Sequence, residues 1–293
     1  MPFHELLLEI TTAQVEAAEA ACFAAGALSV TLADAGDEPL LEPAPGATPL
    51  WQRLHLAALF PGGTESAPLA ARLTETLGLE PGSIRSRQIE DRIWEREWLR
   101  DFRPMRFGQR LWVCPGGQPA GAPDALVLEL DPGLAFGSGT HATTALCLEW
   151  LDRHPPVGLQ VLDYGCGSGI LALASLRLGA AAAWAFDIDP QALIATRDNA
   201  ERNDLLARLH IVAAADRLPG GFDLVLANIL AGPLIGLAPE FAARCRPGAA
   251  LLLAGLLDSQ AKEVAAAYRP WFDIAPEGGR EDWTVLAGIR RRE

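Results

Sequence analysis

The sequence predicts a doubly wound α/β domain with a seven-stranded sheet, preceded by a small α+β domain. From about residue 160 onward, short apolar segments typical of strands alternate with longer segments of helical periodicity. Such alternation implies a largely parallel sheet with helices on both faces. Before residue 90, a strand–helix–strand order occurs twice. Half of the 293 residues are hydrophobic, which is enough to build two cores.

The N-terminal region contains two βαβ units, which are typical of a ferredoxin-like domain with both helices on one sheet face. Thr11 and Gln14 have the spacing of a capping box before the first helix, and Gly26 closes it. A proline-rich segment separates the two units and is expected to be loop. We place this domain at residues 1–90, with strands at 4–10, 28–33, 51–60 and 83–89 and helices at 13–25 and 67–77.

A charged and aromatic segment, residues 91–101, is predicted to be a connecting helix. Trp94 and Trp98 lie four residues apart, on one helical face. We expect these tryptophans to pack against a domain rather than to bind substrate. Residues 91–109 are therefore assigned to the linker and residues 110–293 to the second domain.

The second domain begins with a predicted strand at 110–114 and ends with an antiparallel hairpin of strands 272–275 and 283–289. Asp189 and Pro190 start one of its helices, as an N-cap acid followed by proline at the first helical position. The remaining strands are predicted at 160–163, 183–187, 210–214, 222–227 and 249–254, and the helices at 145–151, 169–178, 191–203 and 259–268.

The net charge of −13 bears on the class of partner. Nucleic-acid-binding proteins usually present a basic face, because their affinity depends on neutralising phosphates. An acidic chain instead attracts a basic partner through long-range electrostatics. We therefore expect no direct nucleic-acid readout.

The cysteines indicate a reducing compartment, and the hydropathy argues against a membrane span. The five cysteines are scattered and form no Cys-x-x-Cys pair, which argues against a disulfide framework and against a zinc site. No apolar run approaches the roughly 20 residues that span a bilayer. The first residues lack the basic flank and apolar core of a signal peptide. We expect a cytoplasmic protein with no membrane contact and no metal.

Residues 161–169, Val-Leu-Asp-Tyr-Gly-Cys-Gly-Ser-Gly, form a strand that runs into a glycine turn. Gly165, Gly167 and Gly169 allow the backbone to turn sharply and to approach a ligand closely. Asp187 ends the next strand, where a carboxylate can accept hydrogen bonds from both hydroxyls of a ribose. This combination predicts a nucleotide-like cofactor.

The glycine spacing selects among such cofactors. The pattern is G-x-G-x-G, whereas the dinucleotide fingerprint of oxidoreductases is G-x-G-x-x-G. Asp163 precedes the turn and would repel a pyrophosphate, but it suits a ligand with an amino group and a sulfonium. S-adenosylmethionine carries both groups together with a ribose. An NAD-dependent oxidoreductase is therefore disfavoured.

Residues 130–144 are dense in glycine and hydroxyl side chains and lead into an apolar helix. The segment resembles a phosphate-binding loop but lacks the Gly-Lys-Ser/Thr ending of one. We interpret it as a flexible cap over the cofactor pocket, with backbone amides and Thr144 as polar contacts. A plain N-capping turn is the alternative. Two roles are open for His141, that of a general base and that of a hydrogen-bonding or gating residue.

Asn228 follows the strand predicted at 222–227, where many amine and amide methyltransferases have Asn or Asp. Its side-chain oxygen can accept a hydrogen bond from a substrate amine and aim that amine at a methyl donor, which is catalysis by orientation. The alternative is a structural asparagine at the turn after the strand.

Four segments, residues 130–144, 163–169, 187–190 and 227–230, together resemble the ribosomal protein L11 methyltransferase family. The junction segments 94–98 and 103–108 also resemble its linker, so the similarity covers essentially the full chain. The resemblance implies an N-terminal domain that binds the ribosomal protein and a C-terminal class I methyltransferase domain. It also implies methylation, up to trimethylation, of lysine side-chain and N-terminal amines on a basic protein, free or on the large subunit.

The family's cofactor contacts can be carried over onto matching positions of this sequence. Ser138 stands where threonine is expected, but it keeps the hydroxyl group. Ala142 stands where proline is common, a change that loosens the loop. Asn228 is predicted to be catalytic, and the predicted cofactor-binding residues are Phe136, Thr144, Asp163, Gly165, Gly167, Asp187 and Asn228.

The alternative functions are a nucleic-acid N-methyltransferase and a non-catalytic interaction module. Nucleic-acid N-methyltransferases carry an aromatic residue shortly after the Asn or Asp, and its ring stacks on the target base. Ile229 and Leu230 occupy those positions here. A non-catalytic interaction module on the same fold would predict decayed cofactor residues, yet Gly165, Asp187 and Asn228 are all present.

Overall fold

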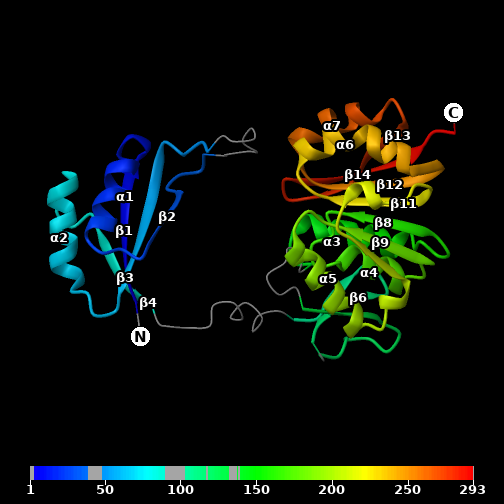
Figure 1. Cartoon of the computed structure of the whole chain (residues 1–293), viewed down its shortest axis with the longest axis horizontal. Coiled ribbons are helices and arrows are strands. Elements are labelled where there is room, and N and C mark those ends of the chain that lie inside the picture. The colour runs from blue at the N-terminus through cyan, green and yellow to red at the C-terminus, as the bar shows by residue number, and fades with distance from the viewer. Residues whose placement is uncertain are drawn as a thin grey trace. The chain divides into compact units, whose positions relative to one another are not determined.

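The computed structural model describes residues 3–38, 48–89, 103–116, 118–131, 137 and 139–292. The chain divides into two compact units, Met1–Trp94 and Glu95–Glu293, and each is described by itself (Figure 1). Several predictions fall outside the described residues, namely the connecting helix at 91–101 with Trp94 and Trp98, the cofactor contact Phe136, and Ser138.

The first unit contains the predicted strands and helices in the predicted order. Its sheet has the strand order β2-β3-β1-β4, and all neighbours are antiparallel. The backbone N–H of Thr11 donates to Gln14 Oε1 at 2.9 Å, which confirms the capping box. The elements are β1 (Phe3–Thr11), a 3-10 turn (Thr12–Gln14), α1 (Val15–Ala24), β2 (Ser29–Asp34), β3 (Arg53–Pro61), α2 (Ser66–Leu77) and β4 (Arg85–Ile89).

Side-chain alternation places the core of the first unit between the sheet and its helices. Alternate residues of a strand share a face, and Leu6 of β1 and Leu56 of β3 are fully buried on one of them. Val15 of α1 and Leu73 of α2 belong to the same apolar cluster. Both helices therefore cover one face of the sheet, as predicted.

The second unit has a mixed seven-stranded sheet with the order β10-β9-β8-β11-β12-β14-β13. The first five strands run parallel, whereas β14 is antiparallel to both of its neighbours, so the predicted terminal hairpin is confirmed. The strands are β8 (Gln160–Tyr164), β9 (Ala182–Phe186), β10 (Leu209–Val212), β11 (Phe222–Asn228), β12 (Cys245–Leu257), β13 (Phe272–Arg280) and β14 (Trp283–Arg290).

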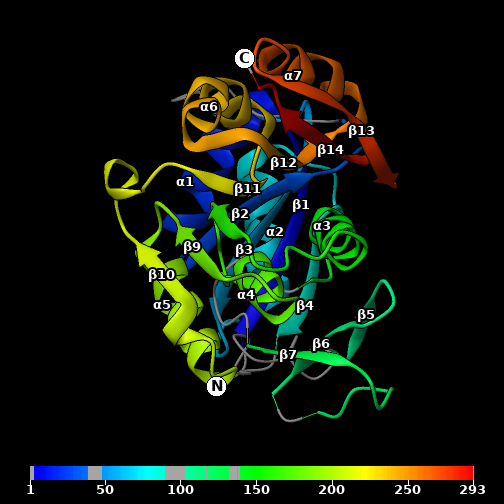
Figure 2. The ribbon, with the colours of Figure 1, turned by 90° about the vertical axis from the view of Figure 1, so that its right-hand side faces the viewer.

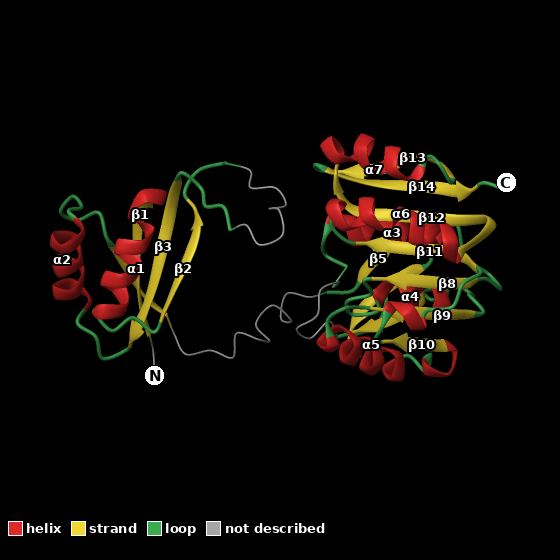
Figure 3. Ribbon diagram, turned by 45° about the horizontal axis from the view of Figure 1, so that its top comes forward, coloured by secondary structure: helices red, strands yellow, loops and turns green. Residues whose placement is uncertain are grey.

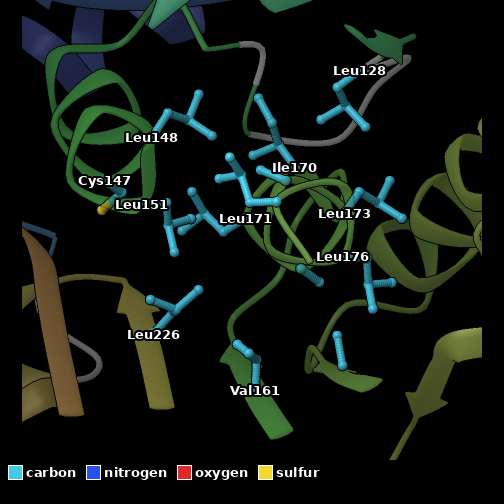
Figure 4. Packing of buried hydrophobic residues seen from close by; sticks show 14 of the residues in the cluster. Leu128, Cys147, Leu148, Leu151, Val161, Ile170, Leu171, Leu173, Leu176 and Leu226 are labelled. Atoms are coloured by element: carbon cyan, nitrogen blue, oxygen red, sulfur yellow. The ribbon is translucent and has the colours of Figure 1, made fainter. Parts of the chain in front are cut away.

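Helices cover both faces of this sheet (Figures 2 and 3). One face packs against α3 (Ala142–Arg153), α4 (Ile170–Arg177) and α5 (Pro190–Arg202), and the other against α6 (Ala231–Arg244) and α7 (Ala261–Tyr268). Figure 4 shows the first of these cores, where Leu151 of α3 and Leu171 of α4 lie above Leu226 of β11. The 3-10 turns are Leu206–Arg208, Ala215–Arg217 and Asp258–Gln260. Among the described helices, none has the length and apolarity of a membrane span.

A small sheet precedes α3 and was only partly predicted. It has the order β5-β6-β7, with β5 (Met105–Phe107), β6 (Leu111–Pro115) and β7 (Leu126–Leu130), and the sequence indicated only β6. The buried Asp152 of α3 accepts a hydrogen bond from the backbone N–H of Gln109 at 2.6 Å. This carboxylate thereby holds the turn between β5 and β6 against the helix.

Candidate active site

A pocket of about 840 Å³ lies at the carboxyl ends of β8, β9 and β11. The strand order reverses between β8 and β11, and ligands of doubly wound sheets bind at such a switch point. The volume falls in the range of small-molecule sites. The lining residues are His141, Thr143, Tyr164, Gly165, Gly167, Phe186, Asp187, Ile188, Asn228, Ile229, Leu230, Pro233, Gly236, Leu237, Gly255 and Trp283.

The glycine turn forms one wall of this pocket, as predicted. Gly165 and Gly167 have φ angles of 79° and 54°, a left-handed conformation that disfavours other residues. A Cβ on Gly165 would also lie 2.3 Å from Cγ2 of Ile229. The backbone N–H of Gly165 donates to the carbonyl of Phe186 at 2.8 Å, so the turn is closed onto the end of β9.

Asp187 lines the pocket directly after β9. Its Oδ2 accepts a hydrogen bond from the backbone N–H of Gly167 at 2.9 Å, and its Oδ1 accepts one from Asp189 at 3.0 Å. Each carboxylate oxygen can accept further bonds. The neighbouring Ile188 is 89% exposed although it is apolar, so the pocket offers a carboxylate beside uncovered apolar surface.

Asn228 ends β11 and reaches the pocket from the other side of the switch point. Its Nδ2 donates to the hydroxyl oxygen of Thr144 at 3.2 Å. Its Oδ1 is buried and has no hydrogen-bond partner within the described part of the chain. A buried acceptor without a donor costs about 1–3 kcal/mol. The site therefore contains an acceptor that a bound donor would satisfy.

The end of the 130–144 segment differs from the predicted loop. Helix α3 begins at Ala142 rather than near residue 145, so Thr144 lies in its first turn and is fully buried. Thr144 is absent from the pocket lining and instead contacts Asn228 from behind. Gly137 lies against the glycine turn, where its carbonyl accepts a bond from the Ser168 hydroxyl at 2.6 Å.

His141 combines a capping position with a place in the pocket wall. It is the N-cap of α3, and its Nδ1 accepts a hydrogen bond from the backbone N–H of Thr143 at 3.3 Å. Its ring packs edge-on against Trp283, with ring centroids 4.9 Å apart. The ring is thus held between the helix start and β14.

Asp163 was predicted to contact the cofactor, but the structure does not place its carboxylate in the pocket. The residue is 1% exposed, and its Oδ2 accepts a hydrogen bond from the backbone N–H of Ala172 in α4 at 2.9 Å. Its Oδ1 has no partner within the described residues, and burial raises the pKa of the group to about 7. Alternation along β8 explains the difference, because Tyr164 faces the pocket whereas Asp163 faces α4 on the other side of the sheet.

Two further pocket residues, Gly255 of β12 and Trp283 of β14, were not predicted from the sequence. The register pairs Trp283 of β14 with Leu257 of β12 and so brings both segments beside Asn228. Nothing local in the sequence distinguishes Trp283 from an ordinary strand residue. An isolated glycine inside a strand pattern, as at Gly255, is the available signal for a close backbone approach.

Replacing Gly255 with alanine is expected to lower both the stability of the protein and the methyl-transfer activity that the resemblance implies. Its φ is 83°, and a Cβ would lie 2.4 Å from the carbonyl oxygen of Ile229, so the backbone beside Asn228 must move. The matched control is Gly236→Ala, in the same pocket wall, where a Cβ meets nothing within 4 Å. Thermal unfolding and turnover of both variants test this. Equal behaviour of the two variants would contradict the close-approach role.

Comparisons with known proteins show the family to which this chain is similar. The family model described as Ribosomal protein L11 methyltransferase (PrmA) matches residues 2–291. The chain is 51% identical to proteins named ribosomal protein L11 methyltransferase from Pseudomonas aeruginosa, over 100% of both chains, and from Azotobacter vinelandii, over 99% of this chain and 100% of that one. The crystal structure of a ribosomal protein L11 methylase from Lactobacillus delbrueckii subsp. bulgaricus matches with a TM-score of 0.60 and 30% identity, covering 65% of this chain and 100% of that one. The chain therefore belongs to the ribosomal protein L11 methyltransferase family of S-adenosylmethionine-dependent protein methyltransferases.

Proposed function

We propose that this protein transfers methyl groups from S-adenosylmethionine to lysine side-chain and N-terminal amines of ribosomal protein L11, up to trimethylation. The observation that carries the proposal is the buried Oδ1 of Asn228 at the pocket, which has no hydrogen-bond partner among the described residues. A substrate amine would supply the missing donor. Family membership supplies the reaction, and the names of the relatives supply the substrate.

The pocket residues fit the methyl donor. Phe186 and Ile188 give apolar walls for a base, and Asp187 provides acceptors for ribose hydroxyls. Gly165 and Gly167 have no side chains, so the amino-acid portion of the donor can lie against the backbone. When bound, the cofactor supplies a methyl group activated by its attachment to a sulfonium.

Asn228 would orient the substrate for an in-line displacement. The Thr144 hydroxyl receives the Nδ2 donor, which leaves Oδ1 to accept an N–H of the substrate amine. Holding that N–H aims the nitrogen lone pair into the pocket. An amide oxygen is no strong base, so the amine must reach the site neutral, and the proton released after transfer leaves to solvent. Orientation of this kind can contribute several kcal/mol to lowering the barrier.

We assign substrate recognition to the N-terminal domain at residues 1–90, with residues 91–109 as the linker and residues 110–293 as a class I seven-stranded methyltransferase domain. The element order and the β2-β3-β1-β4 sheet support a ferredoxin-like fold for the first domain. A net charge of −13 favours a basic protein substrate, either free or on the large subunit. Because the proposed substrate is a ribosomal protein, we propose a cytoplasmic location as well. Ile229 after Asn228 offers no ring for stacking on a nucleic-acid base.

Incubation with labelled S-adenosylmethionine tests the proposal. Purified L11, whole large subunits and protein-free ribosomal RNA serve as separate acceptors. We expect label in L11, and mass spectrometry of its peptides to show trimethylated amines. Label in RNA but not in L11 would refute the proposed substrate, and label confined to monomethylated sites would refute trimethylation.

Replacing Asp187 with alanine is expected to weaken cofactor binding more than it lowers turnover at saturating cofactor. The change removes acceptors for the ribose and also the bond that ties Gly167 to the end of β9. Hydrogen bonds to a charged group contribute about 1.5–3 kcal/mol each, which corresponds to a roughly 10- to 100-fold rise in Kd. Calorimetric titration with S-adenosylhomocysteine measures the change. Asp198→Ala, on the exposed side of α5, is the control, and an unchanged Kd for Asp187→Ala would contradict the assignment.

A further inference from the structure

A second, polar pocket of about 540 Å³ lies on the side of the seven-stranded sheet where the strands begin, opposite to the candidate active site. It forms where α4 and α5 end, shortly before β9 and β10 begin, and β7 forms an adjoining wall. Arginine side chains reach it from three separate elements, namely Arg177 of α4, Arg202 of α5 and Arg208 of a 3-10 turn. The methyl-transfer mechanism uses none of these residues.

Two of these guanidinium groups lie close enough to repel each other. Burial and the charge of Arg208 both lower the pKa of Arg177. Arg177 uses Nη2 to bind the backbone carbonyl and side chain of Asn203, at 3.2 and 3.0 Å. Arg208 uses Nη1 to bind the carbonyl of Ala180 at 3.0 Å. The Nε of Arg177 is buried and has no hydrogen-bond partner within the described residues.

The acidic groups around this pocket do not balance the pair. Arg202, the third arginine, already lies 3.4 Å from Asp131. Glu129 also lines the pocket; it binds Asn203 through its backbone N–H and carbonyl, and its carboxylate lies near Gly116. Among the described residues, Asp204 is the acid whose charge raises the pKa of Arg177. Within the described residues, neither Arg177 nor Arg208 forms an ion pair with an acid.

We propose that this pocket binds a phosphoryl anion between Arg177 and Arg208. A guanidinium presents a planar set of donors that matches phosphate oxygens. Within the described residues, each of these two side chains keeps N–H groups that bind no protein acceptor. A phosphate would relieve the repulsion between the two cations. Such a group could come from free phosphate or from an RNA backbone. The site is separate from the methyl-transfer pocket, so this proposal stands apart from the proposed function.

Direct binding measurements test the proposal with inorganic phosphate as the probe. Equilibrium dialysis against labelled phosphate compares the wild type with Arg177→Gln/Arg208→Gln at constant ionic strength. We expect at least a tenfold rise in Kd in the double variant. Arg269→Gln, an exposed arginine after α7, is the control and is expected to leave Kd unchanged. Equal phosphate binding by the double variant and the wild type would overturn the proposal. Complete displacement of the bound phosphate by chloride at the same ionic strength would overturn it as well.

The single variant Arg208→Gln guards against misfolding, because Arg208 is exposed and loses one backbone hydrogen bond. Its affinity for S-adenosylhomocysteine is expected to stay unchanged, which shows an intact fold, while phosphate binding weakens. A short single-stranded RNA distinguishes the sources. RNA binding that phosphate displaces and Arg208→Gln weakens assigns the site to RNA. Phosphate binding without RNA binding assigns it to a free anion, and binding of neither overturns the proposal.

Discussion

Replacing Asn228 with alanine is expected to lower kcat for L11 methylation by about 100-fold while the Kd of S-adenosylhomocysteine changes only a few-fold. Oriented hydrogen bonds at the reacting group commonly contribute effects of that size. The change removes the buried Oδ1, whereas the glycine turn and Asp187, which form the opposite part of the pocket, keep their contacts. Steady-state kinetics with L11, together with calorimetric titration of the cofactor product, separate the two effects.

Variants of Thr144 test whether the side-chain amide of Asn228 must be held in a fixed orientation. Thr144→Val keeps the shape of this fully buried residue and removes the acceptor for Asn228 Nδ2. We expect kcat to fall about tenfold, the cost of one buried hydrogen bond, with KM for L11 nearly unchanged. Thr144→Ser retains the hydroxyl and is expected to restore most of the rate. Wild-type turnover in Asn228→Ala would contradict the catalytic assignment, and equal rates in the valine and serine variants would contradict the positioning role.

The elements that sequence analysis placed correctly have strong local signals. Asp189 and Pro190 begin α5 at the predicted position, and Asp189 caps it through the backbone N–H of Gln191. By contrast, β5 has three residues and β7 has five, and they pair with β6 across intervening turns. A three-residue segment such as β5 carries too little periodicity to be separated from loop. The length of β7 does not explain why it was missed, because β6 and β8 are equally long and were predicted. The strand order was also inaccessible to periodicity, because it depends on pairing between distant segments.

The predictable part of the candidate site lies at strand ends. Gly165, Asp187 and Asn228 each follow or close a parallel strand, and such ends converge at one edge of the sheet. Side-chain direction within a strand decides the rest. One residue separates Asp163 from Tyr164, yet they face opposite sides, and the acid expected beside the cofactor is buried under α4 instead. Trp283 enters the pocket through the pairing of β12 with β14, which no local pattern indicates.

The buried Asp163 predicts a pH-dependent stability with a definite sign. Burial raises its pKa from 3.8 to about 7, and the charge of Asp187 adds to the effect, while the bond from Ala172 opposes it. Between these two pH values the folded state binds more protons than the unfolded state. The contribution of this group to the free energy of unfolding therefore falls as pH rises from about 4 to about 7, and it is constant above that. A shift of this size corresponds to a loss of the order of 4 kcal/mol.

Asp163→Asn is therefore expected to gain stability relative to the wild type as the pH rises, because an amide cannot ionise. The Asn oxygen can still accept the bond from Ala172, and its buried NH₂ group carries a penalty that does not vary with pH. The difference in free energy of unfolding between variant and wild type, measured by urea titration from pH 4 to pH 8, isolates the ionisation. Asp216→Asn makes the same charge change at an exposed position and is expected to show little slope. A flat difference for Asp163→Asn would mean that the carboxyl group ionises normally, and so that α4 and the glycine turn do not shield it from water.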